Sequence, residues 1–146
     1  MEVILKASLT ESKMLFFSSK RKNLTIEKGI NTPEVNFDSK KGILSLTGIS
    51  IPEDVKTFYD PLIAWIEDYF RSPCRKTILN VHLEYLNTAS SMYLVRLFRT
   101  LETLSDKKHA VEINWIYDST DMDILEEGRD FQSLVSIPIR MVEAKN

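Results

Sequence analysis

Alternating apolar and polar residues predict several short β-strands in this chain. The alternation runs through residues 24–27 and again through residues 34–48, where Lys40-Lys41-Gly42 supplies a turn, so the second stretch is expected to form a β-hairpin. Residues 77–86 and 111–117 are richer in β-branched and apolar side chains, which is typical of interior strands. A last strand is expected at residues 137–142.

Apolar residues at spacings of three and four predict helices between these strands. The first helix is expected over residues 53–70, with Ser50 and Glu53 as a capping box and a bend at Pro61. A second helix follows residues 77–86 and is expected to end near Lys107 and Lys108, because cations are favourable at a helix C-terminus. The acidic residues 118–132 are expected to be helical in part.

The order of these elements predicts an α/β domain with a single mixed β-sheet and helices packed against it. Strands joined by helices are expected to be parallel and to cross over right-handed. Residues 1–23 show no clean period and are expected to form a peripheral or partly disordered N-terminal extension, which leaves residues 24–146 as the domain.

Composition excludes several classes of protein. The chain is 43% apolar and 27% charged with a formal net charge of −2, and its only dense basic run is Lys20-Arg21-Lys22, so no nucleic-acid partner is expected. Cys74 is the only cysteine, which fits a reducing compartment. No stretch approaches the roughly twenty apolar residues of a membrane span. We therefore expect a cytoplasmic protein without a membrane partner.

The sequence carries no recognisable catalytic motif. His82 and His109 are the only histidines; His82 is expected to be packed or hydrogen-bonded in the core, and His109 to be solvated. The four glycines form neither a nucleophile elbow nor a phosphate-binding loop. The chain is therefore not expected to be an enzyme or to hold a cofactor.

An acidic segment is the only candidate for a metal site. Asp118, Asp121 and Asp123 could hold a hard cation in a small metal-dependent hydrolase, although their spacing is not that of an EF-hand. Acidic residues are also favourable at a helix N-terminus for electrostatic reasons alone. Both interpretations are open from the sequence.

Short polar residues follow the strand at 77–86. Asn87, Thr88, Ser90 and Ser91 lie where a buried strand meets a helix N-terminus, so either Asn87 or Thr88 can be an N-cap with no further role. Alternatively, Thr88 is a phosphoacceptor, because a phosphate there gains from the helix dipole and adds about two negative charges to an exposed edge.

Five stretches resemble the SiaC family of bacterial regulatory phosphoproteins. They are NTPEVNFD at 31–38, GILSLTGISIPED at 42–54, FYDPLIAW at 58–65, LEYLNTASS at 83–91 and NWIYD at 114–118. The resemblance runs from about Leu24 to the C-terminus. It implies a fold similar to the STAS-like anti-sigma-factor antagonists, and Thr88 matches the threonine that the family phosphorylates in its Leu-Asn-Thr motif.

The resemblance also implies a partner switch. In the family, a histidine-kinase-like Ser/Thr kinase uses Mg-ATP to phosphorylate this threonine, a PPM-type phosphatase reverses the modification, and the unphosphorylated form binds and activates a diguanylate cyclase in cyclic di-GMP signalling and biofilm control. The surface formed by Asn87, Thr88, Ser90 and Ser91 is then the expected partner-binding site. A constitutive protein-binding scaffold is the alternative, with the metal-dependent hydrolase as a further one.

Overall fold

Seven strands form one mixed sheet whose spatial order follows the chain. The computed structural model describes residues 2–5 and 22–145. The strands, in order across the sheet, are β1 (Glu2–Leu5), β2 (Asn23–Ile26), β3 (Glu34–Asp38), β4 (Ile43–Ser50), β5 (Lys76–Leu86), β6 (Ala110–Tyr117) and β7 (Ile139–Glu143). Only β3 runs against its neighbours, so β4 to β7 form a parallel half of the sheet.

Strands β3 and β4 form the predicted hairpin. Glu34 pairs with Thr47 and Asp38 with Ile43, and the Asp38 carboxylate accepts hydrogen bonds from the backbone N–H groups of Lys40 and Lys41, each at 3.0 Å. Gly42 closes this turn with φ of +69°, a conformation that is unfavourable for residues with a side chain. The hairpin prediction is therefore confirmed.

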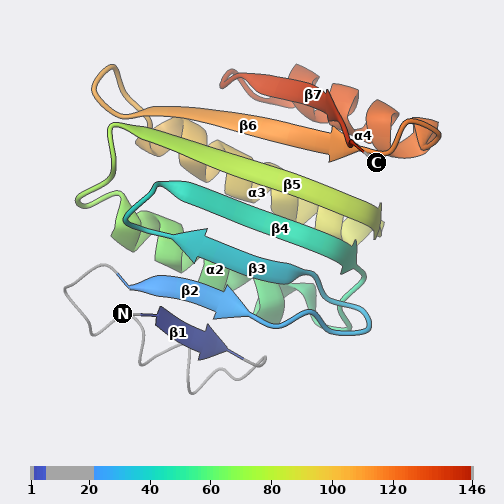
Figure 1. Cartoon of the computed structure of the whole chain (residues 1–146), viewed down its shortest axis with the longest axis horizontal. Helices are drawn as coiled ribbons and strands as arrows, with labels where there is room; N and C mark the ends of the chain where they lie inside the picture. Colours follow the sequence, from blue (N-terminus) through green and yellow to red (C-terminus); the bar gives the residue numbers. More distant parts are fainter. Residues whose placement is uncertain (1, 6–21, 146) are drawn as a thin grey trace.

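Three helices join the parallel strands, and all lie on the same face of the sheet. They are α2 (Val55–Tyr69), α3 (Thr88–Leu104) and α4 (Met122–Leu134), and Figure 1 shows them behind the strands. Side chains from this face of the sheet and from the helices form one apolar core that includes Phe37, Tyr59, Leu62, Phe98 and Trp115, all fully buried. The predicted element order from residue 23 onward is confirmed.

Two predicted helix ends are wrong. Helix α2 is capped by Asp54, whose side chain accepts a hydrogen bond from the N–H of Thr57 at 3.1 Å, and not by Ser50, which ends β4. Helix α3 ends at Leu104 because Ser105 adopts an extended conformation. The Asp106 carboxylate then accepts hydrogen bonds from the N–H groups of Lys108 and His109. Lys107 and Lys108 therefore belong to a turn and not to the end of α3.

The predicted N-terminal extension is described only in part. Glu2–Leu5 pair in parallel with β2 as an additional strand at the edge of the sheet, and Asn23 is the first residue of β2. Residues 1 and 6–21 lie outside the described part of the chain. Among the described residues, no helix has the length and apolar character needed to cross a membrane.

The parallel strands end together at one edge of the sheet, which we call the carboxyl edge. Strands β4, β5 and β6 end there at Ser50, Leu86 and Tyr117, on the right in Figure 1. The polypeptide enters each following helix from this edge. Ligand and partner sites of open α/β sheets typically lie at such an edge, and both segments singled out from the sequence lie here.

Candidate functional site

Thr88 is the first residue of α3 and is exposed at the carboxyl edge. The preceding residue, Asn87, is the N-cap, and its Oδ1 accepts a hydrogen bond from the N–H of Ser90 at 2.9 Å. We call residues 87–91 the Thr88 turn. Asn87 therefore satisfies one of the free donors of the helix end and leaves the Thr88 side chain outside this capping interaction.

Two large exposed apolar side chains lie within four residues of Thr88 in the chain. Tyr85, near the end of β5, is 57% exposed, and Met92 is 66% exposed. Met92 lies four residues after Thr88, which places both on the same face of α3. The surface around Thr88 thus combines an exposed hydroxyl with apolar groups, a combination suited to contact with another protein.

The predicted site residues do not all reach the surface. Asn87 and Ser91 are half-buried and Thr88 is exposed, whereas Ser90 is fully buried. The Ser90 hydroxyl donates to the backbone carbonyl of Ser50 at 2.9 Å. Ser90 is therefore inaccessible to a partner in this structure, because its hydroxyl turns inward to a buried acceptor, and its place in a partner-binding surface stays a prediction.

A carboxylate lies beside the Thr88 turn. The Ser91 hydroxyl donates to Oε1 of Glu127 on α4 at 3.5 Å. Burial raises the pKa of Glu127 and nearby Asp130 raises it further, whereas the hydrogen bond from Ser91 lowers it. Since Ser91 is three residues from Thr88, a negative charge added to Thr88 would lie about one helical turn from a carboxylate that is already partly desolvated.

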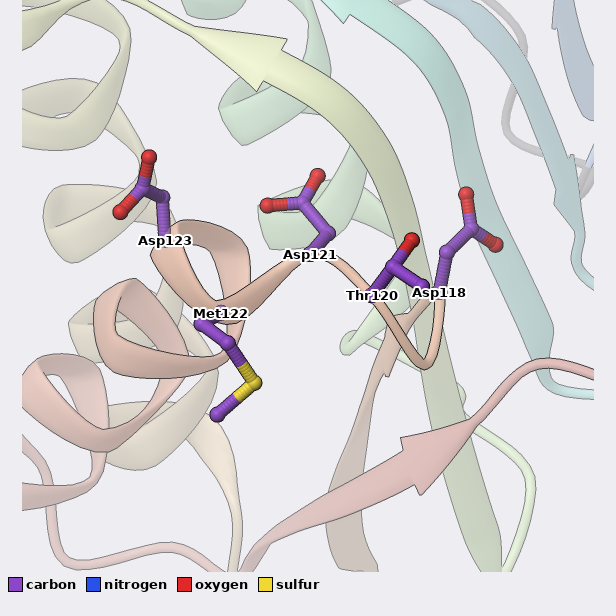
Figure 2. A pocket seen from close by; sticks show the side chains of 5 residues that line it. All are labelled: Asp118, Thr120, Asp121, Met122 and Asp123. Atoms are coloured by element: carbon purple, nitrogen blue, oxygen red, sulfur yellow. The ribbon is translucent and has the colours of Figure 1, made fainter.

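The three aspartates of the acidic segment do not gather around a common point. Asp118, Asp121 and Asp123 line a pocket of about 420 Å³ with Thr120 and Met122, and Figure 2 shows their carboxylates spread along the loop rather than gathered around one point. Asp121 caps α4 by accepting from the N–H of Ile124 at 3.1 Å. Nowhere in the described residues do three potential ligands converge on a metal position, so the geometry gives the hydrolase interpretation no support.

The surroundings of both histidines differ from those expected from the sequence. His82 is not a core residue: its side chain is 35% exposed on the sheet face opposite the helices, and its Nε2 lies 3.6 Å from Oδ1 of Asp118. His109 is half-buried in the turn before β6, and its Nδ1 lies 3.1 Å from Oδ1 of Asp106. Each histidine therefore faces one aspartate, and His82 also lines a shallow pocket with Lys28 and Glu84.

Sequence reasoning missed two buried residues that contact the Thr88 turn. Ser50, at the end of β4, contacts Ser90 of the turn, and Tyr59 on α2 contacts Ser50. A serine before Pro52 suggested a helix cap, and a tyrosine in an apolar stripe suggested ordinary core packing. No local signal in the sequence distinguishes these roles, because the partners are 9 and 40 residues away.

Comparisons with known proteins place this geometry in one family. The model of the SiaC family of regulatory phosphoproteins matches residues 26–144. An uncharacterized protein of Pseudomonas aeruginosa strain UCBPP-PA14 is 29% identical over 108 residues, which cover 74% of this chain and 86% of that protein. The match to the family model begins at the last residue of β2 and spans strands β3 to β7 and the Thr88 turn.

Solved structures of SiaC from Pseudomonas aeruginosa have the same fold. In the crystal structure of the diguanylate cyclase SiaD in complex with its activator SiaC, the similar chain has a TM-score of 0.77 and 27% identity, covering 83% of this chain and 99% of that one. Apo-SiaC has a TM-score of 0.75 and 28% identity, covering 82% and 98%. The predicted STAS-like α/β class is confirmed, and the chain belongs to the SiaC family of regulatory phosphoproteins.

Proposed function

We propose that this protein is a non-enzymatic phospho-switch whose unphosphorylated form binds and activates a diguanylate cyclase. The observation that carries the proposal is the position of Thr88, which is exposed at the N-terminus of α3 within a capped turn. Membership of a family of regulatory phosphoproteins supports it. So does the similarity to a SiaC chain that was solved as the activator of the diguanylate cyclase SiaD.

The modification at Thr88 requires enzymes that act on this chain. A Ser/Thr kinase of the histidine-kinase-like class transfers the γ-phosphoryl group of Mg-ATP to Oγ1 of Thr88; the bond to ADP breaks and the hydroxyl proton passes to a base on the kinase. A PPM-type phosphatase hydrolyses the phosphate ester, which releases inorganic phosphate and restores the hydroxyl. The nucleotide and metal belong to these enzymes, and this chain supplies only the acceptor.

Charge explains how one phosphate could change partner binding. The phosphate adds about two negative charges beside exposed Tyr85 and Met92 and one turn from the Ser91–Glu127 contact. A cyclase surface that covers the neutral Thr88 turn would have to desolvate this charge without a cation to pair it. Such a penalty of several kcal/mol corresponds to about a hundredfold or more in affinity.

Substitutions at Thr88 test the proposal through cyclase binding and cyclic di-GMP production. Thr88→Ala is expected to bind and activate the host's diguanylate cyclase as the unphosphorylated protein does, and to stay active when kinase and ATP are added. Thr88→Asp is expected to bind about tenfold more weakly, since one carboxylate charge at this turn imitates the phosphate incompletely.

A second aspartate substitution provides the control. Thr103 is exposed in the last turn of the same helix, so Thr103→Asp adds the same charge far from the Thr88 turn and is expected to bind like the wild type. If Thr88→Ala lost cyclase binding as completely as Thr88→Asp, the loss would reflect the missing side chain and the charge mechanism would be wrong.

A further inference from the structure

Three buried hydroxyl groups meet directly beneath the Thr88 turn. Ser50 Oγ lies 2.6 Å from Tyr59 Oη and 2.8 Å from Ser90 Oγ. Ser50, Tyr59 and Ser90 are each fully buried and come from three different elements, β4, α2 and α3. The core around them is otherwise apolar, so this cluster, which we call the hydroxyl cluster, joins the three elements at one point.

The Ser50 backbone carbonyl fixes the direction of each hydrogen bond in the hydroxyl cluster. The Ser90 hydroxyl donates to the Ser50 carbonyl, which can only accept. Ser50 Oγ must then donate to Ser90 Oγ, and Tyr59 Oη must donate to Ser50 Oγ. Burial raises the pKa of Tyr59 to about 12, so its phenol keeps this proton at neutral pH.

The hydroxyl cluster is connected to both ends of the Thr88 turn. The Ser50 carbonyl accepts from the N–H of Asn87 at 3.1 Å as well as from the Ser90 hydroxyl. Asn87 and Ser90 are in turn joined by the capping hydrogen bond. Thr88 therefore lies between two residues that are anchored to one carbonyl, and the orientation of its exposed hydroxyl depends on that anchor.

We propose that Tyr59, Ser50 and Ser90 are positioning residues that hold the first turn of α3 in the geometry in which Thr88 accepts the phosphoryl group. This inference rests on the phospho-switch proposed above. Helix ends open more readily than helix centres, and phosphoryl transfer depends strongly on the alignment of the attacking oxygen. A buried network that fixes the first turn of α3 would therefore raise the rate at which the exposed Thr88 is phosphorylated.

The chain contains a matched control for this network. Tyr69, on the same helix as Tyr59, also places its Oη in the core, 2.8 Å from Oγ1 of Thr77. Thr77 lies at the start of β5, at the opposite edge of the sheet from Thr88. Tyr69 Oη also accepts from the N–H of Cys74 at 3.1 Å, so Tyr69→Phe removes at least as many buried hydrogen bonds as Tyr59→Phe. Only Tyr59→Phe removes a partner of the residues that hold the Thr88 turn.

The first test is the phosphorylation of full-length variants in clarified lysate of the native host supplied with Mg-ATP. For Tyr59→Phe, the maximal rate of Thr88 phosphorylation at a fixed amount of lysate is expected to fall about tenfold with little change in KM, because misalignment affects the transfer step more than binding. Tyr69→Phe is expected to stay within about twofold of the wild type. Equal rates for the two variants would overturn the inference, whereas an unmodified wild type would instead contradict the phospho-switch itself.

Hydrogen exchange tests the positioning without any kinase. In Tyr59→Phe, the amides of Ser90 and Ser91 are expected to exchange about fivefold faster than in the wild type, the factor that corresponds to one lost hydrogen bond. Tyr69→Phe is expected to leave these two amides unchanged while it accelerates exchange near Thr77. Identical protection of the Thr88 turn in both variants would show that the hydroxyl cluster does not hold it.

Discussion

At the scale of single residues, the Thr88 turn depends on side chains that point inward. Asn87 caps the helix and Ser90 bonds to the Ser50 carbonyl, so two of the four polar residues that the sequence singled out serve mainly to fix the backbone. Thr88 and Ser91 keep surface-facing roles, and Ser91 contacts Glu127. The Thr88 side chain stays exposed while its neighbours Asn87 and Ser90 are anchored.

Removal of the Asn87 cap should therefore affect both stability and phosphorylation. Asn87→Ala is expected to lower the free energy of unfolding by about 1 kcal/mol, because the N–H of Ser90 loses its acceptor. Urea denaturation measures this loss, and peptide mass spectrometry measures the expected slower phosphorylation of Thr88.

Asp121→Ala is the matched control, since Asp121 caps α4 in the same way through the N–H of Ile124. It is expected to cost a similar free energy of unfolding, about 1 kcal/mol, and to leave Thr88 phosphorylation unchanged. An unaltered urea midpoint for Asn87→Ala, or equal phosphorylation of the two variants, would contradict the role assigned to the cap.

At the scale of elements, the sequence predicts the regular parts better than their ends. The alternation in the β3–β4 hairpin and the apolar stripe of α2 are local signals, and both predictions are confirmed. The hydroxyl cluster and the inward position of Ser90 could not be predicted, because they depend on residues that only the folded chain brings together. Helix ends were misplaced at Ser50 and beyond Leu104 for the same reason, since several polar residues could cap each helix.

Helix α4 illustrates how close packing fixes one element against the sheet. A Cβ atom on Gly128 would lie 2.4 Å from Cδ1 and 2.7 Å from Nε1 of Trp115, whose indole N–H donates to the carbonyl of Ile124 at 2.7 Å. Gly128→Ala is therefore expected to force α4 away from β6 and to lower the free energy of unfolding by about 1–3 kcal/mol.

Urea denaturation followed by tryptophan fluorescence measures this effect. Arg129→Ala, at the neighbouring exposed position of α4, is the control and is expected to stay within about 0.5 kcal/mol of the wild type. Wild-type stability for Gly128→Ala would mean that α4 is not held as closely as the structure shows.

At the scale of the whole molecule, the fold brings the proposed phosphoacceptor Thr88, exposed apolar side chains and an acidic loop to one edge. Because β5 and β6 are parallel, Leu86 at the end of β5 and Tyr117 at the end of β6 both lie at the carboxyl edge, although they are far apart in the chain. The hydroxyl cluster connects this edge to α2 on the helical face. One modification at Thr88 can thus change the charge of a surface without any change in the fold.

The central claim is that Thr88 is phosphorylated and dephosphorylated in the cell. Peptide mass spectrometry of the protein purified from its native host, grown both attached and planktonic, tests it most directly. The account predicts a phosphate on Thr88 whose occupancy differs between the two conditions. A chain that carries an unmodified Thr88 in every condition would contradict the switch and leave a constitutive protein-binding scaffold as the function of this fold.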